Sequence, residues 1–87
     1  FDYTICSEVI EHLKYPERLL ENVHHAIRKF AIITTPNGLQ PDGTMDEPGA
    51  YDYFVWSPET FADLLRGYDF EFIDLRPDTI SVKLYKN

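Results

Sequence analysis

The sequence predicts a mixed α/β fold, in which two parallel strands joined by a crossover helix are followed by an antiparallel hairpin. Three observations support this prediction. A short apolar run precedes an amphipathic helical pattern, a β-branched run follows that pattern, and two alternating segments separated by a Pro-Asp pair end the chain. Strands that alternate with helices form parallel sheets, whereas strands joined by a tight turn pair antiparallel.

The first half of the chain predicts a strand–helix–strand unit. Consecutive apolar residues at Tyr3–Cys6 indicate an interior strand covered on both faces. Pro16 suits the first turn of a helix, and Ala31–Thr35 is a β-branched run closed by a Pro-Asn-Gly turn. Between them, apolar residues fall on one stripe of a helix, namely Leu19, Leu20, Val23, Ala26, Ile27 and Phe30.

The second half predicts a long loop, a capped helix and a hairpin. Residues 36–56 are rich in proline, glycine and acids, and a loop of this length is usually a lid or disordered. Ser57 and Pro58 are expected to begin a helix that ends near Gly67. Its buried stripe would be Phe61, Leu64, Leu65 and Tyr68. Phe70–Leu75 and the alternating residues Ile80, Val82 and Leu84 would then form the hairpin.

Length and charge limit the classes of function. A chain of 87 residues forms one domain at most, and its formal net charge of −7 opposes phosphate backbones, so nucleic acid is not expected as a partner. The single cysteine, Cys6, lies in an apolar run, which favours a reducing compartment. There is no apolar run long enough to cross a membrane, so a cytoplasmic location is expected. Because Phe1 already enters a strand, the chain is expected to be a piece of a larger fold.

The stretch SEVIEH (residues 7–12) is the best candidate for chemistry. Ligands of open α/β sheets bind beyond the carboxyl ends of the strands, and Cys6, Ser7 and Glu8 come at such an end. If a helical turn follows, then Glu8, Glu11 and His12 share one face.

Four segments carry a resemblance to a known family: FDYTICSEVIEHL, AIITTPNG, WSPETF and YDFEFIDL. Together they resemble the C-terminal half of a class I S-adenosylmethionine-dependent methyltransferase of the small-molecule type. The resemblance covers essentially the whole chain, residues 1–87, as a partial methyltransferase domain. It implies that the chain supplies the fourth to seventh strands of the family's sheet, with an antiparallel last strand between the fifth and sixth. It also implies that Cys6, Ser7 and Glu8 line the methionine part of the cofactor. The family's glycine-rich loop and ribose-binding acid have no counterpart in these residues.

Three roles are open for the acids and the histidine of SEVIEH. The spacing E-x-x-E-H resembles that of small-RNA 3′-terminal 2′-O-methyltransferases, which use it to hold a metal. Those enzymes have a further histidine ligand in the segment before the later helix. The corresponding segment here, YDYFVWSPETF, contains no histidine, so no metal is expected. Alternatively, Glu11 or His12 orients the substrate or removes its proton, as a carboxylate or imidazole can. In the third role, both side chains only satisfy neighbouring polar groups.

Other residues are weaker candidates. Thr35, Pro36 and Asn37 end the second strand at the edge where Ser7 ends the first, and are expected to face the acceptor. The aromatic cluster Tyr51, Tyr53, Phe54 and Trp56 either packs the loop onto the sheet or stacks on a planar substrate. His24 and His25 are expected at the surface of the helix.

The resulting prediction is methyl transfer from S-adenosylmethionine to a small-molecule acceptor, with Glu11 and His12 as catalytic residues. As a fragment, the chain is expected to be inactive in isolation. The alternatives are a non-catalytic module with the same fold and a metal-assisted RNA 2′-O-methyltransferase. The expected partners are a small-molecule substrate, without nucleic acid or membrane, and a second copy of the chain. That copy would pair with the outer edge of the Tyr3–Cys6 strand, whose backbone groups would otherwise be bare.

Overall fold

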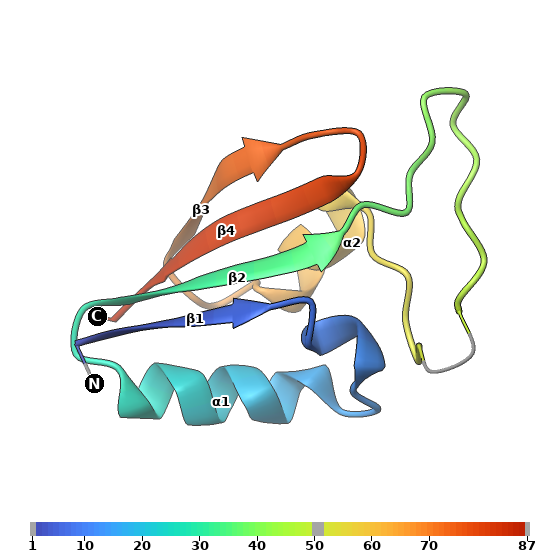
Figure 1. Cartoon of the computed structure of the whole chain (residues 1–87). Helices are drawn as coiled ribbons and strands as arrows, with labels where there is room; N and C mark the ends of the chain where they lie inside the picture. Colours follow the sequence, from blue (N-terminus) through green and yellow to red (C-terminus); the bar gives the residue numbers. More distant parts are fainter. Residues whose placement is uncertain (1, 50–51, 87) are drawn as a thin grey trace.

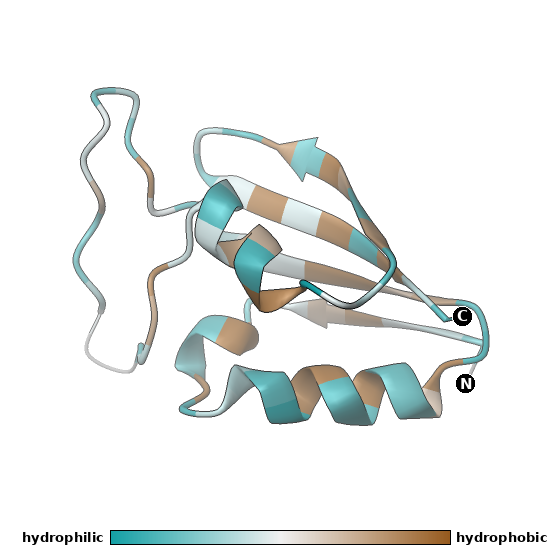
Figure 2. Ribbon diagram, turned by 180° about the vertical axis from the view of Figure 1, so that it is seen from behind, coloured by the Kyte–Doolittle hydropathy of each residue, from teal (hydrophilic) through white to brown (hydrophobic). Residues whose placement is uncertain are grey.

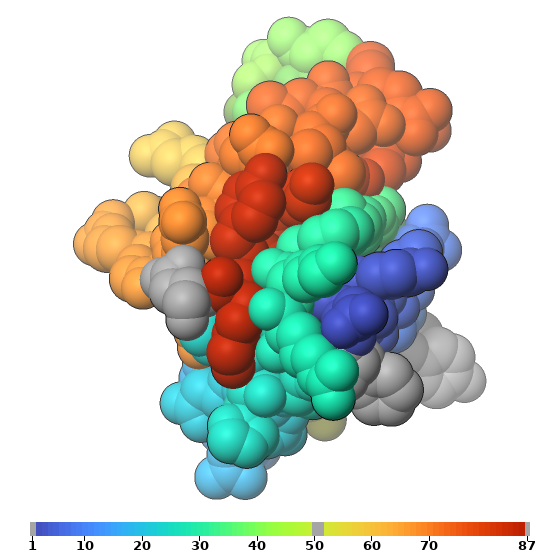
Figure 3. Space-filling view, turned by 90° about the vertical axis from the view of Figure 1, so that its left-hand side faces the viewer, coloured from blue at the N-terminus to red at the C-terminus, as the bar shows by residue number. Residues whose placement is uncertain are grey.

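The computed structural model describes residues 2–49 and 52–86 and contains one mixed sheet with the order β1-β2-β4-β3. Strand β1 (Tyr3–Ser7) runs parallel to β2 (Phe30–Pro36). Strand β4 (Thr79–Tyr85) is antiparallel to β2 and also to β3 (Phe70–Leu75). Figure 3 shows the four strands side by side in this order. The predicted mixed α/β sheet, with a parallel pair and a terminal hairpin, is confirmed.

Helices α1 (Pro16–Ala26) and α2 (Pro58–Leu64) lie on the same face of the sheet (Figures 1 and 2). The core lies between them and the sheet, because alternate residues of the two central strands point to the helices and are fully buried. These strand residues are Ala31, Ile33 and Thr35 of β2 and Ile80, Val82 and Leu84 of β4. The helical layer contributes buried apolar side chains, chiefly Leu20, Val23, Ile27, Phe61 and Leu65.

Strand β1 differs from the prediction of an interior strand. Tyr3 and Ile5 are 61% and 66% exposed, while Thr4 and Cys6 on the helix-facing side are half-buried. The reason is that the described residues place a covering layer on only one face, and β1 pairs only with β2. The strand is therefore an edge strand, and self-association through that edge stays a prediction.

Helix α1 is shorter than the predicted stripe. It ends at Ala26 because Ile27 is in an extended conformation, with φ −82° and ψ 156°. Ile27 still reaches the core, but Ala26 is exposed and Phe30 already belongs to β2. Of the six predicted residues, Leu20, Val23 and Ile27 are buried and Leu19 is partly buried against the core, so the stripe is wrong for Ala26 and Phe30.

Helix α2 begins where its cap residues predict. Ser57 Oγ accepts a hydrogen bond from the backbone N–H of Thr60 (3.2 Å), and Thr60 Oγ1 accepts one from the N–H of Ser57 (2.9 Å). This reciprocal pair is a capping box, with threonine in the place usually taken by an acid or amide. Phe61 and Leu65 are fully buried below it, whereas Leu64 and Tyr68 are half-buried.

The segment between β2 and α2 projects beyond the sheet, as Figure 1 shows. Its two ends are held together: the N–H of Gly38 donates to the carbonyl of Trp56 at 2.8 Å, and Asn37 and Trp56 form an isolated parallel bridge. A side chain at Gly38 would collide with Val55 Cγ1, so the crossing of the two ends needs glycine. The predicted long loop is confirmed, and its base is ordered by these contacts.

Within residues 2–49 and 52–86, neither helix has the length and apolar composition that crossing a bilayer requires.

The cap of α2 gives a stability test. Replacing Ser57 by alanine removes the acceptor for the Thr60 amide, so the free energy of unfolding should fall by about 1 kcal/mol. Urea unfolding of the chain measures this value. The control Glu21→Ala, at an exposed position of α1, should change it by less than about 0.5 kcal/mol. Equal effects of the two substitutions would show that the capping box contributes nothing.

Candidate functional site

The carboxyl ends of β1 and β2 form the edge of the sheet at which the candidate residues gather. Ser7, the last residue of β1, is the register partner of Thr34, and β2 continues two residues further to Pro36. The next residue, Glu8, has φ 56°, which is rare outside glycine, and its N–H donates to the carbonyl of Thr34 at 2.8 Å. This left-handed residue turns the chain away from β1 and into a short 3-10 helix, η1 (Ile10–His12).

The predicted shared face of Glu8, Glu11 and His12 is wrong. Glu8 cannot belong to the right-handed turn because its own backbone is left-handed, and η1 contains only residues 10–12. Glu8 is exposed at the end of β1, while Glu11 is buried. Across the two described ranges, there is no group of three or more histidine, cysteine, aspartate or glutamate side chains placed to hold a metal ion.

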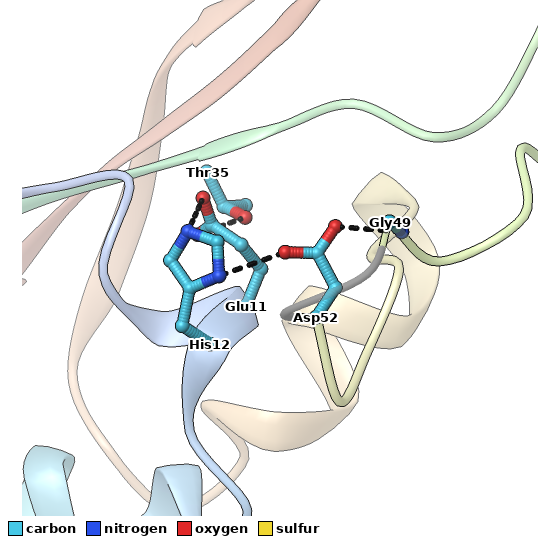
Figure 4. Close-up of polar contacts among 5 residues, drawn as sticks. All are labelled: Glu11, His12, Thr35, Gly49 and Asp52. Atoms are coloured by element: carbon cyan, nitrogen blue, oxygen red, sulfur yellow. Dashed lines mark hydrogen bonds and ion pairs between the residues drawn. The ribbon is translucent and has the colours of Figure 1, made fainter.

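Glu11 joins three segments that are distant in the sequence (Figure 4). Its side chain is 7% exposed, and its Oε1 accepts a hydrogen bond from Thr35 Oγ1 of β2 at 3.2 Å. Its backbone carbonyl accepts from the N–H groups of Tyr53 (2.9 Å) and Phe54 (3.3 Å) in the loop before α2. Thr35, which was expected at this edge from its position alone, therefore contacts the site directly.

His12 lies between two carboxylates. Its Nδ1 is 2.8 Å from Asp52 Oδ1, and its Nε2 is 3.7 Å from Glu11 Oε2. Asp52 is held in turn, because its Oδ2 accepts from the N–H of Gly49 at 3.0 Å. We refer to Glu11, His12 and Asp52 as the acid–imidazole row (Figure 4). The sequence did not single out Asp52 as a site residue, and the available signal was an acid next to the aromatic cluster, near the end of a loop expected to be either a lid or disordered.

A pocket of about 100 Å³ adjoins this row. Glu11 and Asp52 form part of its wall, and the rest comes from the beginning and end of the long loop. The other lining residues are Pro36, Gly38, Asp46, Glu47, Phe54, Val55 and Trp56. The wall therefore combines four carboxylates with apolar and aromatic groups.

Within the aromatic cluster, Trp56 packs the loop onto the core. Trp56 is 7% exposed and lies 5.8 Å, between ring centres, from Phe61 of α2 and 5.1 Å from Phe54. Tyr53 and Phe54 are exposed, and the prediction for Tyr51 lies outside the described residues. Within the described part of the chain, the Trp56 Nε1 is buried and has no hydrogen-bond partner.

The residues expected to line a cofactor lie at the end of β1. Ser7 and Glu8 are exposed, and Cys6 is half-buried on the helix-facing side. Burial raises the pKa of the Cys6 thiol above its ordinary value, so the thiol stays protonated at neutral pH.

The two other histidines lie away from this edge, on α1. His25 is exposed as predicted. His24 is half-buried and its ring makes an edge contact with Tyr68 at 5.1 Å, so the prediction of a surface position is wrong for this residue.

Comparison with solved structures identifies the type of fold. The chain is similar to a chain of the Pnkp1/Rnl/Hen1 RNA repair complex, with a TM-score of 0.70 and 23% identity over 99% of this chain. A second structure of the Pnkp1/Rnl/Hen1 complex has a TM-score of 0.71 and 24% identity over 98% of this chain. The N-terminal domain of EvdMO1 with SAH bound has a TM-score of 0.59 and 15% identity over 100% of this chain. No protein-family model and no curated protein sequence matches the chain.

These matches show an S-adenosylmethionine-dependent methyltransferase-like fold, since SAH is what remains of that cofactor after it gives up its methyl group. The likeness does not extend to the small-molecule type of methyltransferase. The chain spans 22% of the length of the two RNA repair chains and 46% of the EvdMO1 domain.

The prediction that nucleic acid is not a partner is wrong. It rested on the net charge of −7, but two of the structures that share the fold belong to complexes containing Hen1, one of them named as an RNA repair complex. The physical error is that the net charge was counted over this segment alone. The basic groups that neutralise phosphates need not lie in this segment, which spans 22% of the length of those chains.

The hydrogen bond between Thr35 and Glu11 can be tested by a double-mutant cycle. Thr35→Val removes the donor from a buried carboxylate, so it should lower the free energy of unfolding by about 1–3 kcal/mol. In a Glu11→Met background the same substitution should cost much less, because the acceptor is gone. Urea unfolding of the four proteins measures the coupling. Additive effects would show that the two side chains do not interact.

The contact between His12 and Asp52 can be tested by nitrogen-15 NMR of the imidazole. Asp52→Asn replaces a charged acceptor by a neutral one, so the Nδ1–H signal of His12 should move toward the position of a weaker hydrogen bond. The matched control is Asp46→Asn, which changes a carboxylate of the same pocket that is bonded to Gln40. It should leave the imidazole signals in place. Identical imidazole spectra for the two variants would contradict the contact between His12 and Asp52.

Proposed function

We propose that the chain takes part in S-adenosylmethionine-dependent methyl transfer to a hydroxyl group, with Glu11 as the proton acceptor. The observation that carries this proposal is the buried Glu11 carboxylate, which lines a pocket beside the ligand-binding edge of a methyltransferase-like sheet. Open α/β sheets bind their ligands beyond the carboxyl ends of the strands, and both β1 and β2 end at this edge.

The cofactor side of the proposed site consists of Cys6, Ser7 and Glu8. S-adenosylmethionine supplies a methyl group on a positively charged sulfur and carries an ammonium group on its methionine part. The exposed Glu8 carboxylate and Ser7 hydroxyl suit that ammonium group, and the protonated Cys6 adds a neutral wall. The residues present therefore fit the methionine part of the cofactor.

The acceptor side consists of the acid–imidazole row. Glu11 Oε1 is fixed by Thr35, which leaves Oε2 on the side of His12. As the acceptor oxygen gains the methyl group, its proton passes to the Glu11 carboxylate. His12, tethered to Asp52, lies 3.7 Å from that carboxylate and is placed to share the proton. Side chains that are held in place in this way lower the entropy cost of aligning the acceptor oxygen with the methyl carbon. That alignment is the main requirement of a displacement at a methyl carbon.

The acceptor hydroxyl belongs either to a small molecule or to RNA. RNA is supported by two observations of different origin. The spacing of Glu8, Glu11 and His12 resembles that of small-RNA 2′-O-methyltransferases, and a similar structure comes from an RNA repair complex. A small molecule suits the size of the pocket, which is about 100 Å³.

The proposal predicts that one substitution lowers the rate of methyl transfer and a different one weakens the binding of SAH. Glu11→Gln should lower methyl transfer by about 100-fold or more, because general-base catalysis contributes that much. It should leave the dissociation constant of SAH nearly unchanged. Glu8→Ala should weaken SAH binding, since its carboxylate lies at the end of β1. Because this chain lacks the family's glycine-rich loop and ribose-binding acid, both quantities are measured in a complete protein that carries the segment. Calorimetry measures binding, and transfer of a radiolabelled methyl group to RNA and to hydroxylated small molecules measures turnover.

The control for both variants is Glu21→Gln, which changes an exposed acid of α1 and should alter neither quantity. The proposal fails if Glu11→Gln keeps the turnover of the unmodified chain. It also fails if a complete protein that carries the unmodified segment transfers a methyl group to none of the acceptors, which would favour a non-catalytic module.

A further inference from the structure

A second hollow lies beside the base of the long loop, on the side away from the acid–imidazole row. Pro36 and Gly38 line the pocket of the candidate site, whereas Asn37 and Leu39 line this second hollow. Successive residues of an extended segment point to opposite sides, so one stretch of chain separates the two. The hollow has a volume of about 410 Å³, and the turn between β3 and β4 lies next to the loop base at this end of the sheet (Figure 1).

The wall of this hollow is largely apolar. It includes three prolines, Pro41, Pro58 and Pro77, and we refer to it as the proline hollow. Leu39 and Leu75 also line it, and they are 38% and 53% exposed although they are aliphatic. Apolar groups that are exposed together beside polar ones are typical of interaction sites. Among residues 2–49 and 52–86, the lining side chains include no aromatic ring, so a nucleic-acid base would find nothing to stack on.

The segments around the proline hollow are joined to one another by hydrogen bonds. The side-chain amide of Asn37 donates to the carbonyl of Arg76 at 3.0 Å, and its oxygen accepts from the N–H of Leu39 at 3.0 Å. The N–H of Asn37 also donates to the carbonyl of Asp78 at 3.1 Å. The loop base and the β3–β4 turn are therefore held in one arrangement before a ligand arrives, which lowers the entropy cost of binding.

Acids surround the proline hollow without lining it. Each of its three prolines is followed in the sequence by an exposed acid, namely Asp42, Glu59 and Asp78. The guanidinium of Arg76, which does line the hollow, is paired with Asp74 at 2.8 Å, so its charge is already balanced. The rim of the hollow is therefore negative.

This charge pattern selects among the possible occupants. The phosphates of RNA are anionic, and a second copy of this chain also carries a net charge of −7, so the rim would repel both. A basic polypeptide would be attracted. Its lysine and arginine side chains have long apolar stems, so they can reach the rim while an apolar residue between them enters the hollow.

We propose that the proline hollow docks an extended, basic segment of a partner protein. A leucine or proline of that segment fills the hollow against Leu39 and Leu75, and its lysine or arginine side chains pair with Asp42, Glu59 and Asp78. This docking is independent of the proposed methyl transfer, because none of these five residues belongs to the candidate site.

Fluorescence anisotropy tests the docking with labelled peptides and a complete protein that carries this segment. The peptide KKPLPKK should bind with a dissociation constant on the order of 0.1 mM. The peptide EEPLPEE keeps the apolar residues but reverses the charge, and it should not bind. The peptide KKGSGKK keeps the charge but lacks the apolar side chains, and it should bind about 3-fold more weakly or worse.

One pair of variants tests the apolar contact. Leu75→Ser removes an exposed side chain from the wall of the hollow and should weaken the binding of KKPLPKK about 3- to 10-fold. The matched control is Ile73→Ser, which changes another exposed aliphatic residue of β3 outside that wall. It should leave the affinity unchanged.

A second pair of variants tests the rim at equal net charge. The combined substitution Asp42→Asn, Glu59→Gln and Asp78→Asn should weaken the binding of KKPLPKK about 5- to 10-fold. The control neutralises the same number of exposed acids elsewhere, by Glu17→Gln, Glu21→Gln and Asp69→Asn. Because it changes the net charge by the same amount, its effect should be less than about 2-fold.

Several results would overturn the docking site. These are no binding of KKPLPKK at millimolar concentration, equal binding of either altered peptide, an unchanged affinity in Leu75→Ser, and equal effects of the two charge variants. A labelled single-stranded RNA whose affinity falls in Leu75→Ser would assign the hollow to nucleic acid and would also overturn it.

Discussion

The burial of one carboxylate, that of Glu11, is the constraint on which the candidate site depends. A buried charge is costly unless it is paired and hydrogen-bonded, so the chain must bring partners to it. Thr35 comes from the sheet and His12 from the same short helix, while Asp52 holds His12 from the loop. Because the Glu11 carbonyl also accepts from Tyr53 and Phe54, the same residue fixes the end of the loop to η1.

Parallel pairing provides the position for this carboxylate. Strand β1 ends opposite Thr34, two residues before the end of β2, so the residues that follow β1 meet the last residues of β2 at one edge. The left-handed conformation of Glu8 then turns the chain sharply, which allows η1 to place Glu11 against Thr35. The uncommon backbone of Glu8, a residue with a side chain, is consistent with a local requirement of the site.

The fold was largely predictable from the sequence because its signals are local. The β-branched run of β2, the cap at Ser57 and the alternation in β4 each identify an element without knowledge of its neighbours. The exposure of Tyr3 and Ile5 was not predictable, since a run of apolar residues does not reveal whether a second layer covers it.

The site was predictable only in part, because some of its contacts join residues that are far apart in the sequence. Glu11 and His12 stood out because they are close in the sequence, whereas Asp52 belongs to the row through a contact that spans the long loop. Glu8 was grouped with them by assuming a regular helical turn, and a single left-handed residue invalidates that assumption. Net charge misled the choice of partner because it was counted over a segment that spans only 22% of the similar chains, and phosphates can be neutralised by basic groups elsewhere in such chains.

The central claim is that the Glu11 side chain holds the loop before α2 in place, and amide hydrogen exchange tests it most directly. In Glu11→Ala the side-chain contacts with Thr35 and His12 are lost, so η1 should loosen and the amides of Tyr53 and Phe54 should exchange faster. The amides at Ile33 and Val82 in the centre of the sheet should keep their protection. Unchanged exchange at Tyr53 and Phe54 would contradict the claim.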